Sequence, residues 1–372
     1  MARLKDWIEL GKSTFTSLTN DDVTNLYVVE WPETRKMLIA EHRAAIEGDP
    51  NRVRRTVRLG SAMLFGLAKK LAPHRRLLFL FAWVFFFVCI FSLATHLKNP
   101  PVWTLFQTSV MFVLMTLLLG MELIDKIKFR DELALARDLQ ASIIPHEMPQ
   151  HPAYEIAAFN HIANTVGGDI YDFVPLEDGR LAVLFGDASG HGMAAGLVMA
   201  VAHAAFRTQL EIDSSPASII ASLNRILCRT GSSRSFFAAC YVLLSPDGTY
   251  LATIAGHPPI LKIDNTGKIV DRIGRGAYPL GIKNANQWSA TSGSLEPGER
   301  LLLHSDGLTE SRNENDREFG DAYVEVICGW HPDATATGLV DSLVSEWRMF
   351  TSRLPAEDDV SVAVIRFRSA VT

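Results

Sequence analysis

The chain has 372 residues, of which 21% are charged, and its formal net charge is −5. This length exceeds that of one compact core of usual size, so two or three organised segments are expected. Charges of both signs are mixed through the C-terminal half, which argues against a nucleic-acid partner. The four cysteines lie far apart without a CxxC pair, so neither a disulfide framework nor a zinc site is indicated.

The N-terminal region, residues 1–75, begins without the apolar segment of a secretory signal peptide. A helical pattern covers residues 36–48, and a basic apolar stretch covers residues 52–73. The second stretch either lies on an anionic membrane surface or packs on its neighbours as an ordinary helix. Both interpretations stay open.

Two uncharged apolar runs follow, at residues 77–94 and 102–120. As a helix, each spans about 27 Å or slightly more, which is close to the hydrocarbon thickness of a bilayer. Two buried helices of a soluble core would be expected to carry a polar face, which these runs lack. The sequence therefore predicts a transmembrane helical hairpin within residues 76–122.

Basic residues flank this hairpin on both outer sides, whereas the turn between the runs holds only Lys98. The flanking residues are Arg52, Arg54, Arg55, Arg58, Lys69, Lys70, Arg75 and Arg76 before the first run, and Lys126, Lys128 and Arg130 after the second. Cytoplasmic loops carry such an excess of Lys and Arg. We therefore predict a multi-pass protein of the inner (cytoplasmic) membrane with the N-terminus and the C-terminal domain in the cytoplasm.

A linker helix is predicted over residues 123–150. Its apolar residues form one helical stripe, which consists of Phe129, Leu133, Ala136, Leu139 and Ile143. The stripe fits a parallel coiled coil between two chains, and hence a homodimer, or a helix docked on its own catalytic domain. The sequence leaves both interpretations open.

Residues 151–372 read as an α+β layered domain. Short β-rich runs are expected at residues 154–163, 180–187, 236–245, 249–256, 258–264, 300–306 and 360–367. Helices are expected at residues 193–210, 215–230 and 335–351. The SPDGTY segment at residues 245–250 predicts a hairpin turn between two of the strands.

Four aspartates of this domain, Asp169, Asp187, Asp306 and Asp359, are expected where apolar strands end. Any one of them is most simply a turn or cap residue. Carboxylates that converge at one sheet edge repel one another unless a cation neutralises them, and hard oxygen ligands favour Mg2+ or Mn2+. Adjacent glycines, and a helix that begins near His191, favour phosphate as the substrate group.

The segments ARDLQASIIP, VGGDIYDF, GDASGHGMAAGLVMA, AGHPPIL, YPLGI, SDGLTES and DDVSVAVI occupy roughly residues 133–368. In order and spacing they resemble the SpoIIE and RsbU-type bacterial serine phosphatases, a branch of the PP2C-like metal-dependent phosphatases. The resemblance implies an αββα sandwich, in which two packed sheets hold two divalent cations, Mn2+ or Mg2+, at one end.

By this resemblance, Asp187 bridges both metals and the carbonyl of Ala188 adds a ligand. Asp306 and Asp359 hold one metal, and Asp169 supports the other directly or through water. Neighbouring side chains on an extended chain point in opposite directions, so only one of Asp358 and Asp359 faces the metals, and the resemblance implies that it is Asp359.

The implied nucleophile is a hydroxide between the metals, so no side chain is assigned as catalytic. His191 and His257 are therefore left without a role, and the default interpretation of His257 is a turn residue with a satisfied side chain. For Glu310 and Arg312 the default is a surface position.

The resemblance implies hydrolysis of phosphoserine or phosphothreonine on a cytoplasmic regulator of the anti-sigma-factor antagonist type. Two other functions stay open from the residues alone. One is a catalytically silent membrane signalling scaffold, and the other is a phosphohydrolase of a small nucleotide or lipid headgroup, although no Walker sequence is present.

Overall fold

The computed structural model has two compact units, which divide at Lys128 and Phe129. The described residues are 52–95, 102–145, 147–163, 165–190, 192–231, 235–274, 276–284, 288–352, 354 and 356–369. The helix predicted at residues 36–48 lies outside the described residues.

The first unit contains long helices. These are α5 (Arg52–Lys70), α6 (Pro73–Thr95) and α7 (Val102–Ile143), which continues into the second unit. Pro73 opens α6, a position where its missing N–H costs nothing. The guanidinium of Arg75 pairs with Glu122 at 3.0 Å and with Asp125 at 2.6 Å, which joins the start of α6 to α7.

Both α6 and α7 are long and apolar enough to cross a membrane. Their apolar side chains are largely exposed, with exposed fractions of 59% for Phe81 and 69% for Phe112. The second predicted span and residues 123–143 of the predicted linker form one continuous helix, which ends at Ile143 rather than at residue 150. The division of the chain at residues 75, 122 and 150 stays a prediction.

The second unit contains two five-stranded sheets with antiparallel strand pairs. The first has the order β1 (Tyr154–His161), β10 (Val360–Phe367), β9 (Arg300–His304), β6 (Ile260–Ile263) and β7 (Ile269–Ile273). The second has the order β2 (Ile170–Pro175), β3 (Leu181–Ala188), β4 (Phe237–Leu244), β5 (Thr249–Ala255) and β8 (Thr291–Ser294).

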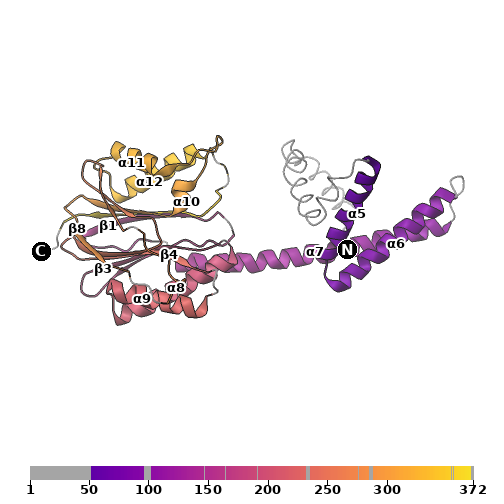
Figure 1. The fold of residues 1–372 in the computed structure, drawn as a ribbon, viewed down its shortest axis with the longest axis horizontal. Coiled ribbons are helices and arrows are strands. Elements are labelled where there is room, and N and C mark those ends of the chain that lie inside the picture. Colours follow the sequence, from indigo (N-terminus) through magenta and orange to yellow (C-terminus); the bar gives the residue numbers. More distant parts are fainter. Residues whose placement is uncertain are drawn as a thin grey trace, which may run out of the picture. The chain divides into compact units, whose positions relative to one another are not determined.

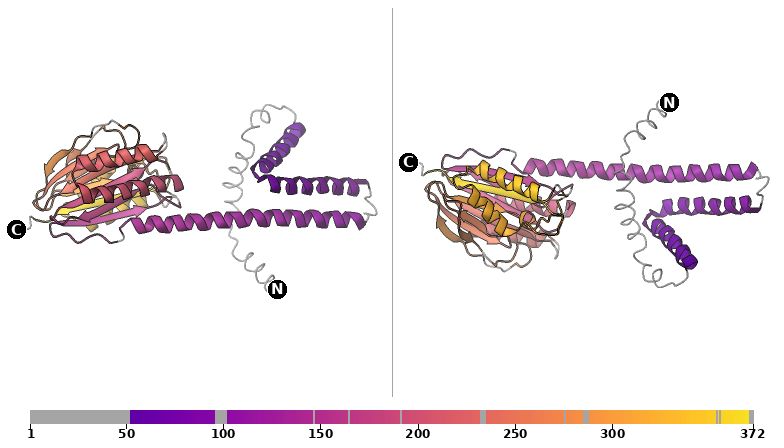
Figure 2. Two further views of the ribbon diagram at one scale, coloured as in Figure 1. Left: turned by 90° about the horizontal axis from the view of Figure 1, so that it is seen from below. Right: turned by 90° about the horizontal axis from the view of Figure 1, so that it is seen from above.

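Helices cover the outer face of each sheet. They are α8 (Met193–Ile212) and α9 (Pro216–Thr230) on the second sheet, and α10 (Asp306–Glu310), α11 (Gly320–Trp330) and α12 (Ala336–Phe350) on the first. Figure 1 shows these four layers edge-on, and Figure 2 shows each helical layer in front of its sheet. The predicted αββα sandwich is confirmed.

One apolar core fills the space between the sheets, and a second lies under α11 and α12. Phe185 of the second sheet and Leu301 and Ile365 of the first belong to this core, whereas Tyr241, on the other face of β4, packs against Phe206 of α8. The central strands β3, β4, β9 and β10 are buried on both faces, which explains why they read as continuous apolar runs.

All the predicted strands and helices of this unit form, and the SPDGTY segment makes the β4–β5 turn, with Leu244 opposite Tyr250. Strands β2, β7 and β8 and helices α10 and α11 were not predicted. The sequence of β8 is Thr-Ser-Gly-Ser, which has no apolar side chain to indicate a strand.

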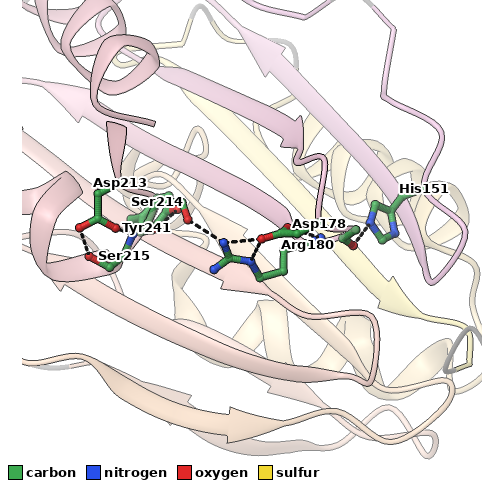
Figure 3. Close-up of polar contacts among 8 residues, drawn as sticks. His151, Asp178, Arg180, Asp213, Ser214, Ser215 and Tyr241 are labelled. Atoms are coloured by element: carbon green, nitrogen blue, oxygen red, sulfur yellow. Dashed lines mark hydrogen bonds and ion pairs between the residues drawn. The ribbon is translucent and has the colours of Figure 1, made fainter. Parts of the chain in front are cut away.

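A polar network secures the end of the sandwich where β3 begins (Figure 3). Arg180 donates to Asp178 at 2.7 Å and to the hydroxyl of Ser214 at 3.0 Å. The hydroxyl of Tyr241 donates to the carbonyl of Ser214 at 2.7 Å. The β2–β3 turn is thereby tied to the α8–α9 connection, at the opposite end of β3 from Asp187.

Candidate metal centre

Four separate segments bring the predicted aspartates to one end of the sandwich. Asp187 lies at the end of β3, and Asp306 begins α10 directly after β9, as expected. Asp169 and Asp359 instead stand just before β2 and β10, so the prediction that each ends a strand was wrong for these two. Because neighbouring strands are antiparallel, the start of one strand lies beside the end of the next, and the carboxylates still converge.

The carboxylates perturb one another strongly. Burial, followed by the charges of Asp306, Asp358 and Asp359, raises the pKa of Asp187 to about 7. Burial and then the charge of Asp187 raise the pKa of Asp169 well above its usual range. Neighbouring carboxylates cannot both ionise freely, so they either share a proton or bind a cation.

The residues fit a hard cation. Asp169 is 2% exposed, and its Oδ2 is buried with no hydrogen-bond partner among the described residues. A buried carboxylate oxygen without a donor is costly unless a cation approaches it. Among the described residues, no group of three or more His, Cys, Asp or Glu side chains is arranged to hold a metal ion. A bound cation would therefore need main-chain oxygen and water as further ligands, as is common for Mg2+.

Asp359 also secures the segment that precedes Asp169. Its Oδ1 accepts the N–H of Ala163 at 2.8 Å, and its Oδ2 accepts the N–H of Gly168 at 2.6 Å. Asp359 is 6% exposed, whereas Asp358 is exposed to solvent. Asp359, the buried member of the pair, is thus the residue that the family resemblance implied as a metal ligand.

Two serines near Asp169 were missed by the sequence analysis. Ser305 and Ser361 are both buried, the hydroxyl of Ser305 donates to the carbonyl of Asp359 at 3.2 Å, and the polar influence of the two serines opposes the rise of the pKa of Asp169. Ser305 also accepts the N–H of Ser361 at 2.9 Å. The available signal was their position, since Ser305 precedes Asp306 and Ser361 follows Asp359 by two residues, on the same face of the strand.

His191 and His257 were left without a role by the sequence analysis. His191 lies outside the described residues. His257 is buried, its Nδ1 donates to the carbonyl of Pro258 at 3.0 Å, and burial lowers its pKa to about 4. Its Nε2 has no hydrogen-bond partner among the described residues, so the expectation of a fully satisfied side chain was wrong for one of its two nitrogens.

A groove of about 1130 Å³ is lined by residues that adjoin Asp306 and Asp359 in the chain, although none of the four aspartates lines it. Gly307 and Asp358 lie on its wall, together with Glu310 and Arg312, which the sequence analysis left as surface residues. The guanidinium of Arg312 pairs with Asp316 at 2.8 Å and with Glu318 at 2.6 Å, so it shapes the wall of the groove.

Comparison with known proteins identifies the domain. The family described as Stage II sporulation protein E (SpoIIE) matches residues 177–368, which is more than half of the chain. The chain belongs to the SpoIIE family. The SpoIIE-family domain resembles the SiaA-PP2C domain of Pseudomonas aeruginosa, with a TM-score of 0.58 at 20% identity over 65% of this chain and 98% of that one. This likeness shows the PP2C-like fold.

Two relatives from Bacillus subtilis (strain 168) align with the SpoIIE-family domain. Phosphoserine phosphatase RsbU is 28% identical over 194 residues, which are 50% of this chain and 56% of RsbU. Phosphoserine phosphatase RsbP is 22% identical over 225 residues, which are 59% of this chain and 54% of RsbP. The chain thus spans about half the length of the curated relatives it matches.

Proposed function

We propose that this chain is a membrane-tethered, metal-dependent serine/threonine protein phosphatase. The observation that carries the proposal is the convergence of Asp169, Asp187, Asp306 and Asp359, in which Asp187 is influenced by all of the others. Such mutual repulsion is a cost to the fold unless the site binds cations.

Two divalent cations, Mn2+ or Mg2+, would be held by Asp169, Asp187, Asp306, Asp359 and the carbonyl of Ala188. When bound, they would make a water molecule acidic enough to attack phosphorus at neutral pH and would neutralise the phosphoryl oxygens. The protein's own contribution is to position these ligands. Ser305 and Ser361 favour the charged form of Asp169, and no side chain is assigned as nucleophile.

The proposed substrate is phosphoserine or phosphothreonine on a cytoplasmic regulatory protein of the anti-sigma-factor antagonist type. Two relatives that bear the name phosphoserine phosphatase support the amino-acid class. The groove that Gly307 and Asp358 line is larger than a usual small-molecule pocket, which suits a segment of a folded protein. A role in signal transduction and stress-response regulation follows from this substrate class.

The membrane anchor is proposed from α6 and α7. Their exposed apolar side chains would be expected to associate with lipid rather than with water. The basic flanks support a cytoplasmic location for the N-terminus and the phosphatase domain, in a multi-pass protein of the inner membrane. Alkaline carbonate extraction of cell membranes tests this, since a peripheral protein would be released into the supernatant.

A homodimer is proposed through the linker part of α7. Its last turns dock on the domain, where Ile144 joins the core between the sheets. Earlier along the helix Phe129 is 61% exposed and Leu139 is 61% exposed, so a partner helix could cover them. A changed helix pairing would then pass a signal to the phosphatase. A disulfide cross-link that locks two linkers together and leaves turnover unchanged would count against this control.

The function is tested by measuring phosphate release by the detergent-solubilised full chain in the presence of Mn2+. We expect turnover of a phosphoserine protein and little turnover of nucleotides or lipid headgroups. Preference for a nucleotide or headgroup would favour the small-substrate phosphohydrolase. Absence of cation-dependent release from p-nitrophenyl phosphate as well, in a folded sample, would favour a silent scaffold.

A further inference from the structure

A buried amide marks the end of α7. Gln140 is 3% exposed, although its neighbour Leu139 is 61% exposed, so the helix turns its polar residue inward. The Nε2 of Gln140 donates to the carbonyl of Gly167 at 2.9 Å, and its Oε1 accepts the N–H of Gly167 at 2.9 Å. One side chain therefore satisfies both backbone groups of one residue.

Gly167 leads directly into the carboxylate site. The N–H of the next residue, Gly168, donates to Oδ2 of Asp359 at 2.6 Å, and the carbonyl of Gly168 accepts the N–H of Ala188 at 3.2 Å. Asp169 follows. Gly167 and Gly168 thus connect Gln140 to three proposed ligand residues: Asp169 through the chain, and Asp359 and Ala188 through hydrogen bonds.

The segment has little other support of its own. Strand β2 begins only at Ile170, so Gly167 is not part of the sheet ladder. A Cβ at Gly167 would lie 2.3 Å from Oδ2 of Asp359, which leaves no space for a side chain to hold the segment from within. A Cβ at Gly196 of α8 would lie 2.5 Å from Val166, so α8 packs closely against the residue that precedes Gly167.

We propose that Gln140 is a positioning residue for the metal-binding segment 165–169. The inference rests on the proposed function only in taking Asp169 and Asp359 as metal ligands. A leucine at this position would leave a buried N–H and a buried carbonyl unpaired. A glutamate could still accept the N–H of Gly167 but could not donate to its carbonyl, so it would preserve half of the contact.

The test is amide hydrogen exchange of the full chain in detergent without divalent cations, which needs no catalysis. We expect exchange at Gly167 and Gly168 to be fastest in Gln140→Leu, intermediate in Gln140→Glu and slowest in wild type, with about a tenfold difference for each lost bond. The apparent Kd for Mn2+ should be highest in Gln140→Leu, intermediate in Gln140→Glu and lowest in wild type. Ser142→Ala is the matched control, because Ser142 is exposed and, among the described residues, its hydroxyl bonds only to the carbonyl of Leu139 in its own helix.

Unchanged exchange at Gly167 and Gly168 in both variants would overturn the proposal. An equal acceleration in β4, at Cys240 and Tyr241, would also overturn it, because Gln140 would then stabilise the whole domain rather than this segment. If Gln140→Leu does not fold, Gln140→Glu against Ser142→Ala decides. A wild-type protein without phosphatase activity would refute the proposed function, whereas the exchange result would still decide the role of Gln140.

Discussion

The backbone N–H of Gly168 donates to Oδ2 of Asp359 at 2.6 Å and joins two segments that are 191 residues apart. The contact requires glycine. A Cβ at Gly168 would lie 2.7 Å from the carbonyl oxygen of Ala188 and 2.8 Å from Oδ1 of Asp187. The carboxylates can therefore approach one another only because this part of the chain has no side chain.

Gly168→Ala is expected to displace the proposed ligands and to lower kcat/KM by about a hundredfold, since small misplacements at a reacting centre have effects of this order. Gly329→Ala is the control, because a Cβ there would meet nothing within 4 Å and alanine favours the helix. Steady-state kinetics with Mn2+ measure both. Wild-type kinetics in Gly168→Ala would contradict the close packing described here.

The anchor between β2 and α8 gives a stability prediction. Asp172 is fully buried, and Arg207 donates to its two oxygens at 2.6 Å and 2.8 Å. Arg207→Ala leaves that buried carboxylate with His203 as its remaining partner. We expect the free energy of unfolding to fall by about 3 kcal/mol, in denaturant titrations followed by tryptophan fluorescence.

Arg312→Ala is the matched comparison for Arg207→Ala. The side chains of Arg207 and Arg312 are similarly exposed, at 49% and 42%, but Arg312 pairs with carboxylates that are themselves exposed. Its loss should lower the free energy of unfolding by much less than the loss of Arg207, because solvent screens exposed ion pairs. Equal losses for the two variants would show that burial of Asp172 adds nothing to its ion pair.

Removal of metal should make stability depend on pH. The pKa of Asp187 is raised from 3.8 to about 7, so in that window the folded chain keeps a proton that the unfolded chain releases. Without cations, the stability from that proton is present below 3.8 and is lost as pH rises toward about 7. Mn2+ should restore stability above this window, because it replaces the proton.

The measurement is the unfolding temperature of wild type and Asp187→Asn in EDTA at about pH 5 and about pH 8. Buried histidines act in the opposite direction, since burial lowers the pKa of His257 to about 4, but both proteins contain them. Wild type should therefore lose more stability than Asp187→Asn as pH rises. The same pH dependence in both proteins would contradict the coupling of the carboxylates.

Much of the fold was predictable because its central strands are buried on both faces. The runs that became β3, β4 and β10 are almost wholly apolar and end at turn residues. Strand β2 was missed because its Asp172 interrupts the apolar pattern, and the partners that allow this burial, His203 and Arg207, come from a helix further along the chain.

For the site, the residue types were predictable but the geometry was not. Glycines beside Asp169 and Asp187 indicated a close approach of backbone. Nothing local, however, showed that Gln140 would be buried, because a polar residue in an amphipathic helix ordinarily faces water. Its role depends on a backbone segment 27 residues further along the chain.

The four aspartates are proposed to bind the cations that hydrolysis requires. Calorimetric titration of the full chain with Mn2+, together with phosphate release from a phosphoserine protein, tests this in wild type and Asp187→Asn. We expect two Mn2+ sites in wild type, weakened binding in the variant, and turnover at least about a thousandfold lower in the variant. Hydrolysis that persists in EDTA, or full activity in Asp187→Asn, would contradict the claim.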